Sequence, residues 1–205
     1  MMLDERIKFV LEDKLFVKEH LSLEDEQKLY AIISSYLENR TSLSTFIKNL
    51  DDTIAFYELI GVSYSDMIRS IMIWPAIMHA DKNELVKKYL ILAYVVNAKN
   101  GMCDRDNIVI NHPKDLMTGF DTIYARVMHL SRMAFDGELR TEVITRRKLF
   151  KTTNLEFEQS YGLSKEMLLE RYPVTEDVIE SLKKHNMNKE LVEKYESQGF
   201  GRRTA

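Results

Sequence analysis

The residues best suited to chemistry are seven basic side chains between positions 126 and 151 of the 205-residue sequence. Three acidic residues share this stretch, so its formal net charge is +4. Lysine and arginine bind phosphate oxygens, and arginine does so with two parallel hydrogen bonds. The stretch therefore predicts a nucleic-acid-binding surface made by Arg126, Arg132, Arg140, Arg146, Arg147, Lys148 and Lys151.

The spacing of these bases gathers part of the charge on one side of a helix. Arg140, Arg147 and Lys151 stand at i, i+7 and i+11, which places them on the same helical face. Two alternatives lead away from a phosphate ligand. The face could simply be solvated, or it could pair with residues 154–198, where ten acids stand against six bases.

The other reactive side chains form no recognisable catalytic or metal-binding pattern. Cys103, His112 and His129 occur in one region, but not at the CxxC, HxxxH or HExxH spacings of common zinc sites. The seven glycines form no phosphate-binding loop. Adjacent acids such as Glu176 and Asp177 fall in first helical turns, where they favour the helix dipole. We therefore expect a non-enzymatic protein without catalytic residues, metal or cofactor.

Composition narrows the classes of protein further. The net charge of −3 argues against a strongly basic nucleic-acid coat but leaves room for a local basic surface. Cys103 is the single cysteine, so no disulfide can form within the chain. The longest apolar run, 89–96, is far shorter than the roughly 20 residues of a membrane-spanning helix. The first residues run straight into charges, and we expect a cytoplasmic protein with no membrane contact.

Helices must position these side chains. Glycine (7) and proline (3) are scarce, which favours an all-α fold with few breaks. Ser63 and Thr175 are expected to cap helices, and Asp51 or Asp52 to start another. Apolar periodicity predicts helices over 3–20, 23–38, 82–98, 119–134 and 188–197.

The three prolines share one local setting. Pro75, Pro113 and Pro173 each follow an amphipathic stretch and an aromatic residue or histidine, and each precedes a longer helix. Intervals of 38 and 60 residues separate them. Because proline ends a helix, this recurrence predicts stacked helical hairpins with a proline at each hinge. The alternative is that the three prolines mark unrelated helix ends, because prolines occur at helix ends in any helical protein. Trp74, before the first proline, could pack in the core or offer an exposed ring for stacking.

Three stretches resemble all or part of the repeat of the mitochondrial transcription termination factor family. That repeat reads Leu-Gly-apolar-Ser, a helix, a proline, a short turn with leucine and a second, longer helix. Matching segments are 60–78 with 85–92, 162–173, and, for the second half alone, 111–117 with 120–130. The resemblance covers about 55–182. It implies an α-solenoid-like stack of hairpins whose concave basic face contacts nucleic acid.

These patterns together predict one domain organisation and two functions. Residues 1–50 would form an N-terminal helical cap, 51–198 a helical-repeat region continuous with it, and 199–205 a flexible tail. The preferred function is a non-enzymatic, regulatory module that binds DNA, RNA or a nucleoprotein complex. The alternative is a protein-interaction adaptor or inhibitor that acts through an acidic or apolar helical surface.

Overall fold

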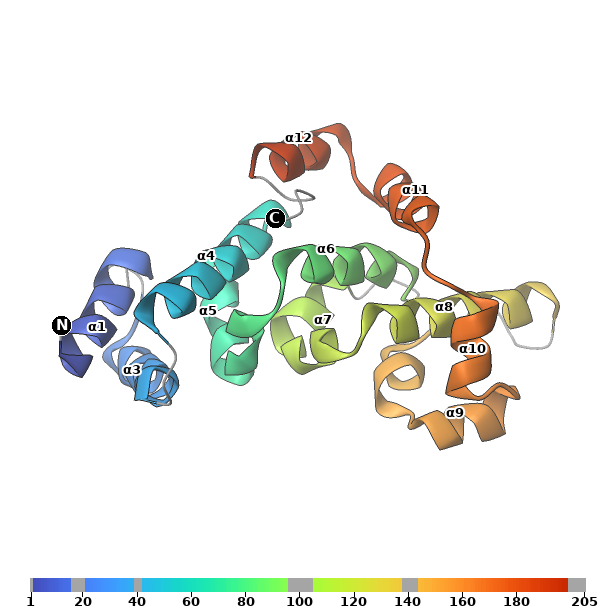
Figure 1. Cartoon of the computed structure of the whole chain (residues 1–205), viewed down its shortest axis with the longest axis horizontal. Coiled ribbons are helices and arrows are strands. Elements are labelled where there is room, and N and C mark those ends of the chain that lie inside the picture. Colours follow the sequence, from blue (N-terminus) through green and yellow to red (C-terminus); the bar gives the residue numbers. More distant parts are fainter. Residues whose placement is uncertain (1, 16–20, 39–41, 96–104, 138–143, 199–205) are drawn as a thin grey trace. The chain divides into compact units, whose positions relative to one another are not determined.

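Helices alone build the described part of the chain. The computed structural model describes residues 2–15, 21–38, 42–95, 105–137 and 144–198, and these residues contain no strand (Figure 1). The all-α prediction from scarce glycine and proline is confirmed. The chain divides into two compact units, Met1–Lys82 and Asn83–Ala205.

The described residues of the first unit pack four α-helices, one short π-helix and one 3-10 helix around an apolar core. Buried in it are Ile33, Phe46, Tyr57 and Ile71. Helix α3 contacts α1 and α5, and η2 lies against both α4 and α5. The elements are α1 (Leu3–Phe9), the π-helical η1 (Val10–Lys14), α3 (Leu23–Glu38), α4 (Leu43–Leu59), α5 (Tyr64–Ile73) and the 3-10 helix η2 (Pro75–His79). Residues 1–50 thus belong to the same unit as α5.

Helix α4 runs straight through the position where a new helix was expected to begin. Ser42 caps it by accepting a hydrogen bond from the Thr45 amide. The prediction that Asp51 or Asp52 starts a helix is therefore wrong. Both carboxylates form ion pairs instead, Asp51 with Lys14 at 3.1 Å and Asp52 with Lys82 at 3.2 Å. Long-range partners of this kind leave no trace in local sequence.

The second unit is organised around one long helix, α8, whose inner face is buried and which contacts both α10 and η5. Its remaining helices are shorter. In chain order the elements are α6 (Lys82–Ile91), η3 (Leu92–Tyr94), α7 (Arg105–Asn111), η4 (Pro113–Met117), α8 (Phe120–Phe135), η5 (Arg147–Lys151), α9 (Asn154–Tyr161), α10 (Lys165–Arg171), α11 (Glu176–Asn186) and α12 (Lys189–Ser197).

Helix α6 ends earlier than the apolar pattern predicts. The α-helical part stops at Ile91, and a 3-10 turn leads to Val95, whose backbone is extended. Leu92 and Val95 are both buried there. Burial of these side chains is compatible with the tighter turn, and periodicity alone cannot distinguish the two conformations.

The first two proline turns share one backbone geometry. Trp74 (φ −143°, ψ 82°) and His112 (φ −137°, ψ 44°) both leave the helical conformation, and each proline opens a five-residue 3-10 helix. Tyr172 (φ −126°, ψ 66°) also leaves the helical conformation before Pro173, but no 3-10 helix follows. A longer helix follows the second and third prolines, whereas α5 and α6 both have 10 residues. The stacking of hairpins stays a prediction.

Candidate nucleic-acid interface

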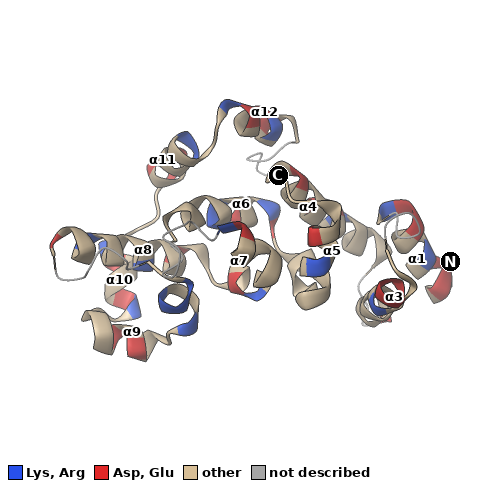
Figure 2. Ribbon diagram, turned by 180° about the vertical axis from the view of Figure 1, so that it is seen from behind, with Lys and Arg blue, Asp and Glu red and all other residues tan. Residues whose placement is uncertain are grey.

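Four of the seven candidate bases lie on one turn. We define the basic turn as residues 146–151, which comprise Arg146 and the π-helical η5. Leu149 is fully buried and anchors the turn, which contacts α8. Arg147 and Lys151 are exposed, while Arg146 and Lys148 are half-buried. Figure 2 shows Lys and Arg gathered on this turn between α8 and α9.

A single buried carboxylate holds the two ends of the basic turn. Asp115, in the 3-10 helix after Pro113, is only 4% exposed. Its Oδ2 accepts a hydrogen bond from Arg146 Nε at 2.5 Å, and its Oδ1 accepts one from Lys151 Nζ at 3.2 Å. Arg146 has five N–H donors and Lys151 has three, so both retain donor capacity for a further ligand. The predicted alternative partner was the acidic stretch 154–198; Asp115 lies outside it, whereas Glu156, which interacts with the charge of Arg147, lies within it.

Arg126 is a buried clamp and lies beneath the surface. Its side chain is 4% exposed and stacks over the Phe157 ring at 4.7 Å. Nη1 donates to the carbonyl oxygens of Leu149 at 2.6 Å and Thr152 at 3.0 Å, and Nη2 donates to Asn154 Oδ1 at 2.9 Å. Burial lowers the pKa of this guanidinium from its ordinary value. Arg126 therefore positions the basic turn and the start of α9.

Arg147 and Lys148 lie in the middle of the basic turn, where their environments differ. Partial burial lowers the pKa of the Lys148 ammonium. The backbone amide and hydroxyl of Thr153 hydrogen-bond to Glu156 and lower the pKa of its carboxyl, and the nearby charge of Arg147 adds to this effect. Of the two, Arg147 is exposed and Lys148 is half-buried.

The two remaining candidates do not join this group. Arg132 lies near the end of α8 and pairs with Asp136 at 3.5 Å, with 57% of the arginine side chain exposed. Arg140 lies outside the described residues. The expected helical face of Arg140, Arg147 and Lys151 is wrong, because Ile144 and Thr145 are not helical and η5 is a separate π-helix that begins at Arg147.

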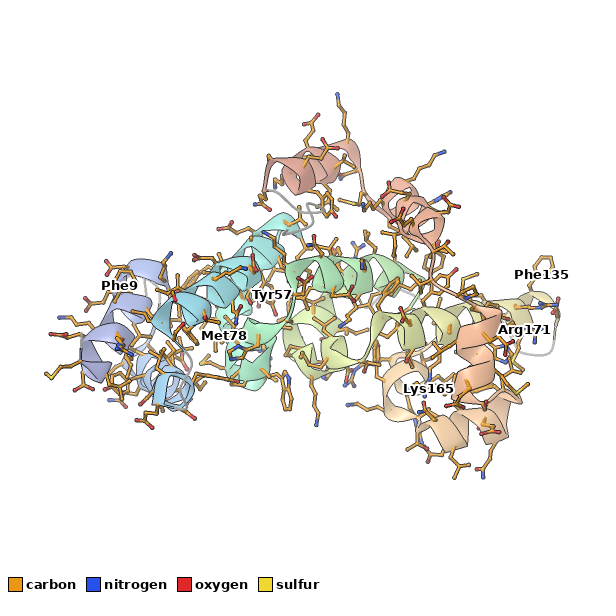
Figure 3. The ribbon with its side chains drawn as sticks, in the orientation of Figure 1. Phe9, Tyr57, Met78, Phe135, Lys165 and Arg171 are labelled. Atoms are coloured by element: carbon orange, nitrogen blue, oxygen red, sulfur yellow. The ribbon has the colours of Figure 1, made fainter. Side chains whose placement is uncertain are left out.

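A polar groove of about 480 Å³ opens beside the basic turn. Two cationic residues line it, Arg126 and Lys165, and none of the described residues that line it is acidic. Lys165 begins α10 and is exposed (Figure 3). Four threonine hydroxyl groups also line the groove. Thr118 lies before α8, Thr122 in its first turn, and Thr152 and Thr153 before α9.

Sequence reasoning missed this groove. Lys165 stands within the acidic stretch 154–198, so charge counted by segment conceals it. The sequence did contain one pattern that could have placed part of the groove. Thr153 and Glu156 form a capping box, which fixes the start of α9. The position of Thr118 and Thr122 at the same groove depends on tertiary packing and has no local pattern.

Of the three residues considered for metal binding, His112 and His129 lie in the described part of the chain. Within the residues described by the structure, no group of three or more His, Cys, Asp and Glu side chains could hold a metal ion. His129 is buried, its Nε2 donating to the Tyr161 carbonyl oxygen at 2.9 Å and its Nδ1 lying 3.5 Å from the Tyr172 hydroxyl. His112 precedes η4, and Cys103 lies outside the described residues.

A second groove, in the first unit, is apolar. It has a volume of about 460 Å³ and lies between α3 and the first proline turn. Tyr36, Trp74 and Pro75 contribute to its lining, together with Ala31 and Ile32. Trp74 is half-buried, intermediate between the two placements considered from sequence.

Comparison of the chain with protein-family models, with curated proteins and with solved structures finds no match. None of the helices in the described ranges has both the length and the apolar content needed to cross a membrane. The functional proposal consequently depends on the geometry of the chain's own residues.

Proposed function

We propose that this protein is a non-enzymatic, helical-repeat module that binds nucleic acid, with the basic turn and its neighbouring groove as contact surface. The observation that carries the proposal is the concentration of cations there. Four bases stand on the turn, Asp115 neutralises one of them, and the adjoining groove adds Lys165 without an acid among its described lining residues. Phosphate groups are the ligands that such a surface attracts.

The hydrogen bonds that hold the basic turn in place make its surface suited to a polyanion. Arg126 and Asp115 hold the turn from beneath, so the cations are already positioned before a ligand arrives. A preformed site loses less conformational entropy on binding. The proposed arrangement is similar to a basic face in the mitochondrial transcription termination factor family, with DNA, RNA or a nucleoprotein complex as partner.

The direct test measures binding of labelled oligonucleotides by fluorescence anisotropy over a range of salt concentrations. The variant Arg147→Gln with Lys148→Gln removes two positive charges from the turn. The slope of log affinity against log salt should then fall by about 1.4 for single strands or about 1.8 for duplex. A matched control, Lys184→Gln with Lys189→Gln, removes two charges from α11 and α12, where both lysines are exposed.

Equal slopes for the two double variants would refute the basic turn as the contact surface, and absence of salt-dependent binding by the native chain would refute the function. Arg147 and Lys148 are the better targets because neither has an ion pair with Asp115. Replacing Arg146 with glutamate would set a second carboxylate beside buried Asp115, and a loss of binding could then reflect disturbed folding.

A second candidate function, a protein-interaction adaptor, is supported by the apolar groove of the first unit. Tyr36 and Trp74 there could hold an apolar or proline-rich segment of a partner. The discriminating variant is Ala31→Asp, which adds a charge at an exposed position of the groove wall. An adaptor should lose its co-purifying partner with Ala31→Asp and keep it with the Arg147 and Lys148 variant. The reverse pattern would remove this candidate.

A further inference from the structure

An aromatic ring lies among the cations and hydroxyl groups of the polar groove. Phe150, on the basic turn, is half-buried and shares the groove lining with Lys165 and Thr118. We infer that the groove binds single-stranded nucleic acid, with one phosphate near Lys165 and the threonine hydroxyls and an adjacent base against Phe150. This inference rests on the proposed function and specifies its ligand.

The phosphate part of the site combines a charge with hydrogen-bond donors. Lys165 supplies the exposed ammonium, and Thr118 and Thr122 supply hydroxyl groups. Between these threonines, Gly119 occupies the N-cap of α8 and gives no side-chain cap, so the first amides of α8 keep donors for an anion. A Cβ built on Gly119 would meet no atom within 4 Å, which leaves the space above it open. Asp121, in the first turn of α8, is exposed and does not line the groove.

Phe150 distinguishes a single strand from a duplex. Every base has a π face that can stack on an aromatic ring, whatever the sequence. Paired bases are already stacked on one another and present only their edges in the grooves. A ligand that reaches Phe150 with a base face while its phosphate lies at Lys165 must therefore have unstacked bases, as a single strand does.

The dimensions agree with this assignment. The groove volume of about 480 Å³ falls within the range of about 300–1,000 Å³ that accommodates one small ligand, and it suits a nucleotide segment. The major groove of a duplex is by itself about 12 Å wide and receives a whole helix or β-ribbon. The π-helix of the basic turn, Arg147–Lys151, has only five residues and is therefore much shorter than the helices that enter a major groove.

The test compares the full chain bound to a short labelled oligothymidylate and to a duplex of equal length, by fluorescence anisotropy at one salt concentration. We expect the single strand to bind at least about tenfold more tightly. Phe150→Leu should weaken single-strand binding by about tenfold, because a stacked base is lost, and leave the salt slope unchanged. Lys165→Gln should instead lower that slope by about 0.7.

A pair of cap variants separates binding from folding. Gly119→Asp and Gly119→Ser both introduce good N-cap residues at an extended backbone position (φ −58°, ψ 137°), so neither should lower the melting temperature. Only the aspartate adds a negative charge to the groove. We expect Gly119→Asp to abolish single-strand binding and Gly119→Ser to retain it.

The possible failures are distinguishable. If neither oligonucleotide binds the native chain, the proposed function and this inference both fail. If the duplex binds as tightly as the single strand, or if Phe150→Leu leaves single-strand affinity unchanged, the inference fails while nucleic-acid binding stands. Equal binding by the two Gly119 variants would also overturn the phosphate position.

Discussion

Substitution of Arg126 offers the sharpest test of how the second unit, Asn83–Ala205, is stabilised. Arg126→Met keeps an apolar stem of similar length and removes the guanidinium. The carbonyl oxygens of Leu149 and Thr152 then lose their donor, as does Asn154 Oδ1. A buried acceptor without a partner costs about 1–3 kcal/mol, and the contact with the Phe157 ring adds about 0.5–2 kcal/mol. Removing a charge from a buried position offsets part of this loss.

The net expectation is a decrease of about 3 kcal/mol in the free energy of unfolding, measured by urea denaturation with far-ultraviolet circular dichroism. Arg132→Met is the matched control in the same helix. Its ion pair with Asp136 is at the surface, so its loss should change stability by less than about 1 kcal/mol. Equal effects of the two substitutions would refute the clamp, since they would show that the three hydrogen bonds to Arg126 contribute nothing beyond a surface pair.

Three further predictions concern buried or strained positions; the first two use the same denaturation assay, and the third uses ultraviolet titration. Asp115→Ala should lower the free energy of unfolding by about 2 kcal/mol. This is less than the roughly 3–5 kcal/mol of a fully buried pair, because Arg146 and Lys151 reach solvent. An unchanged free energy of unfolding would show that Asp115 does not hold the basic turn. Gly162→Ala should cost about 1 kcal/mol, since φ is +80° at the end of α9; a neutral effect would mean that the helix end rearranges. Burial raises the pKa of Tyr57 to about 12, above the ordinary 10, so its contribution is complete below pH 10 and is lost as pH rises towards 12. The pKa of Tyr64 is also raised to about 12 by burial, so ultraviolet titration of Tyr57→Phe should show one of two strongly basic phenols lost; ionisation of Tyr57 near pH 10 would contradict its burial.

Local chemistry was enough to predict much of the helical framework. Ser63 and Thr175 cap α5 and α11 by accepting hydrogen bonds from amides three residues on, as their positions predicted. Asn188 caps the last helix, and Gly61, with a positive φ, follows the end of α4. Caps are decided by residues within one turn, and sequence is informative at that range.

The candidate site was predicted only in part, because its contacts join distant segments. The clustering of bases near 146–151 is visible in the sequence, but the carboxylate that orders them is 31 residues from Arg146. The burial of Arg126 depends on carbonyl groups 23 and 26 residues away. The residues next to Arg126 in sequence give no indication of these partners, so the sequence predicted an exposed side chain there.

The first two proline turns differ at one informative position. Ile77 and Asp115 are each the third residue of their 3-10 helix, and both are buried. The amide of each donates to the carbonyl of the residue before its proline, at 3.0 Å and 2.9 Å. The isoleucine seals an apolar core, whereas the aspartate tethers a charged segment. Two turns with the same pattern of backbone hydrogen bonds can thus serve different purposes through a single side chain.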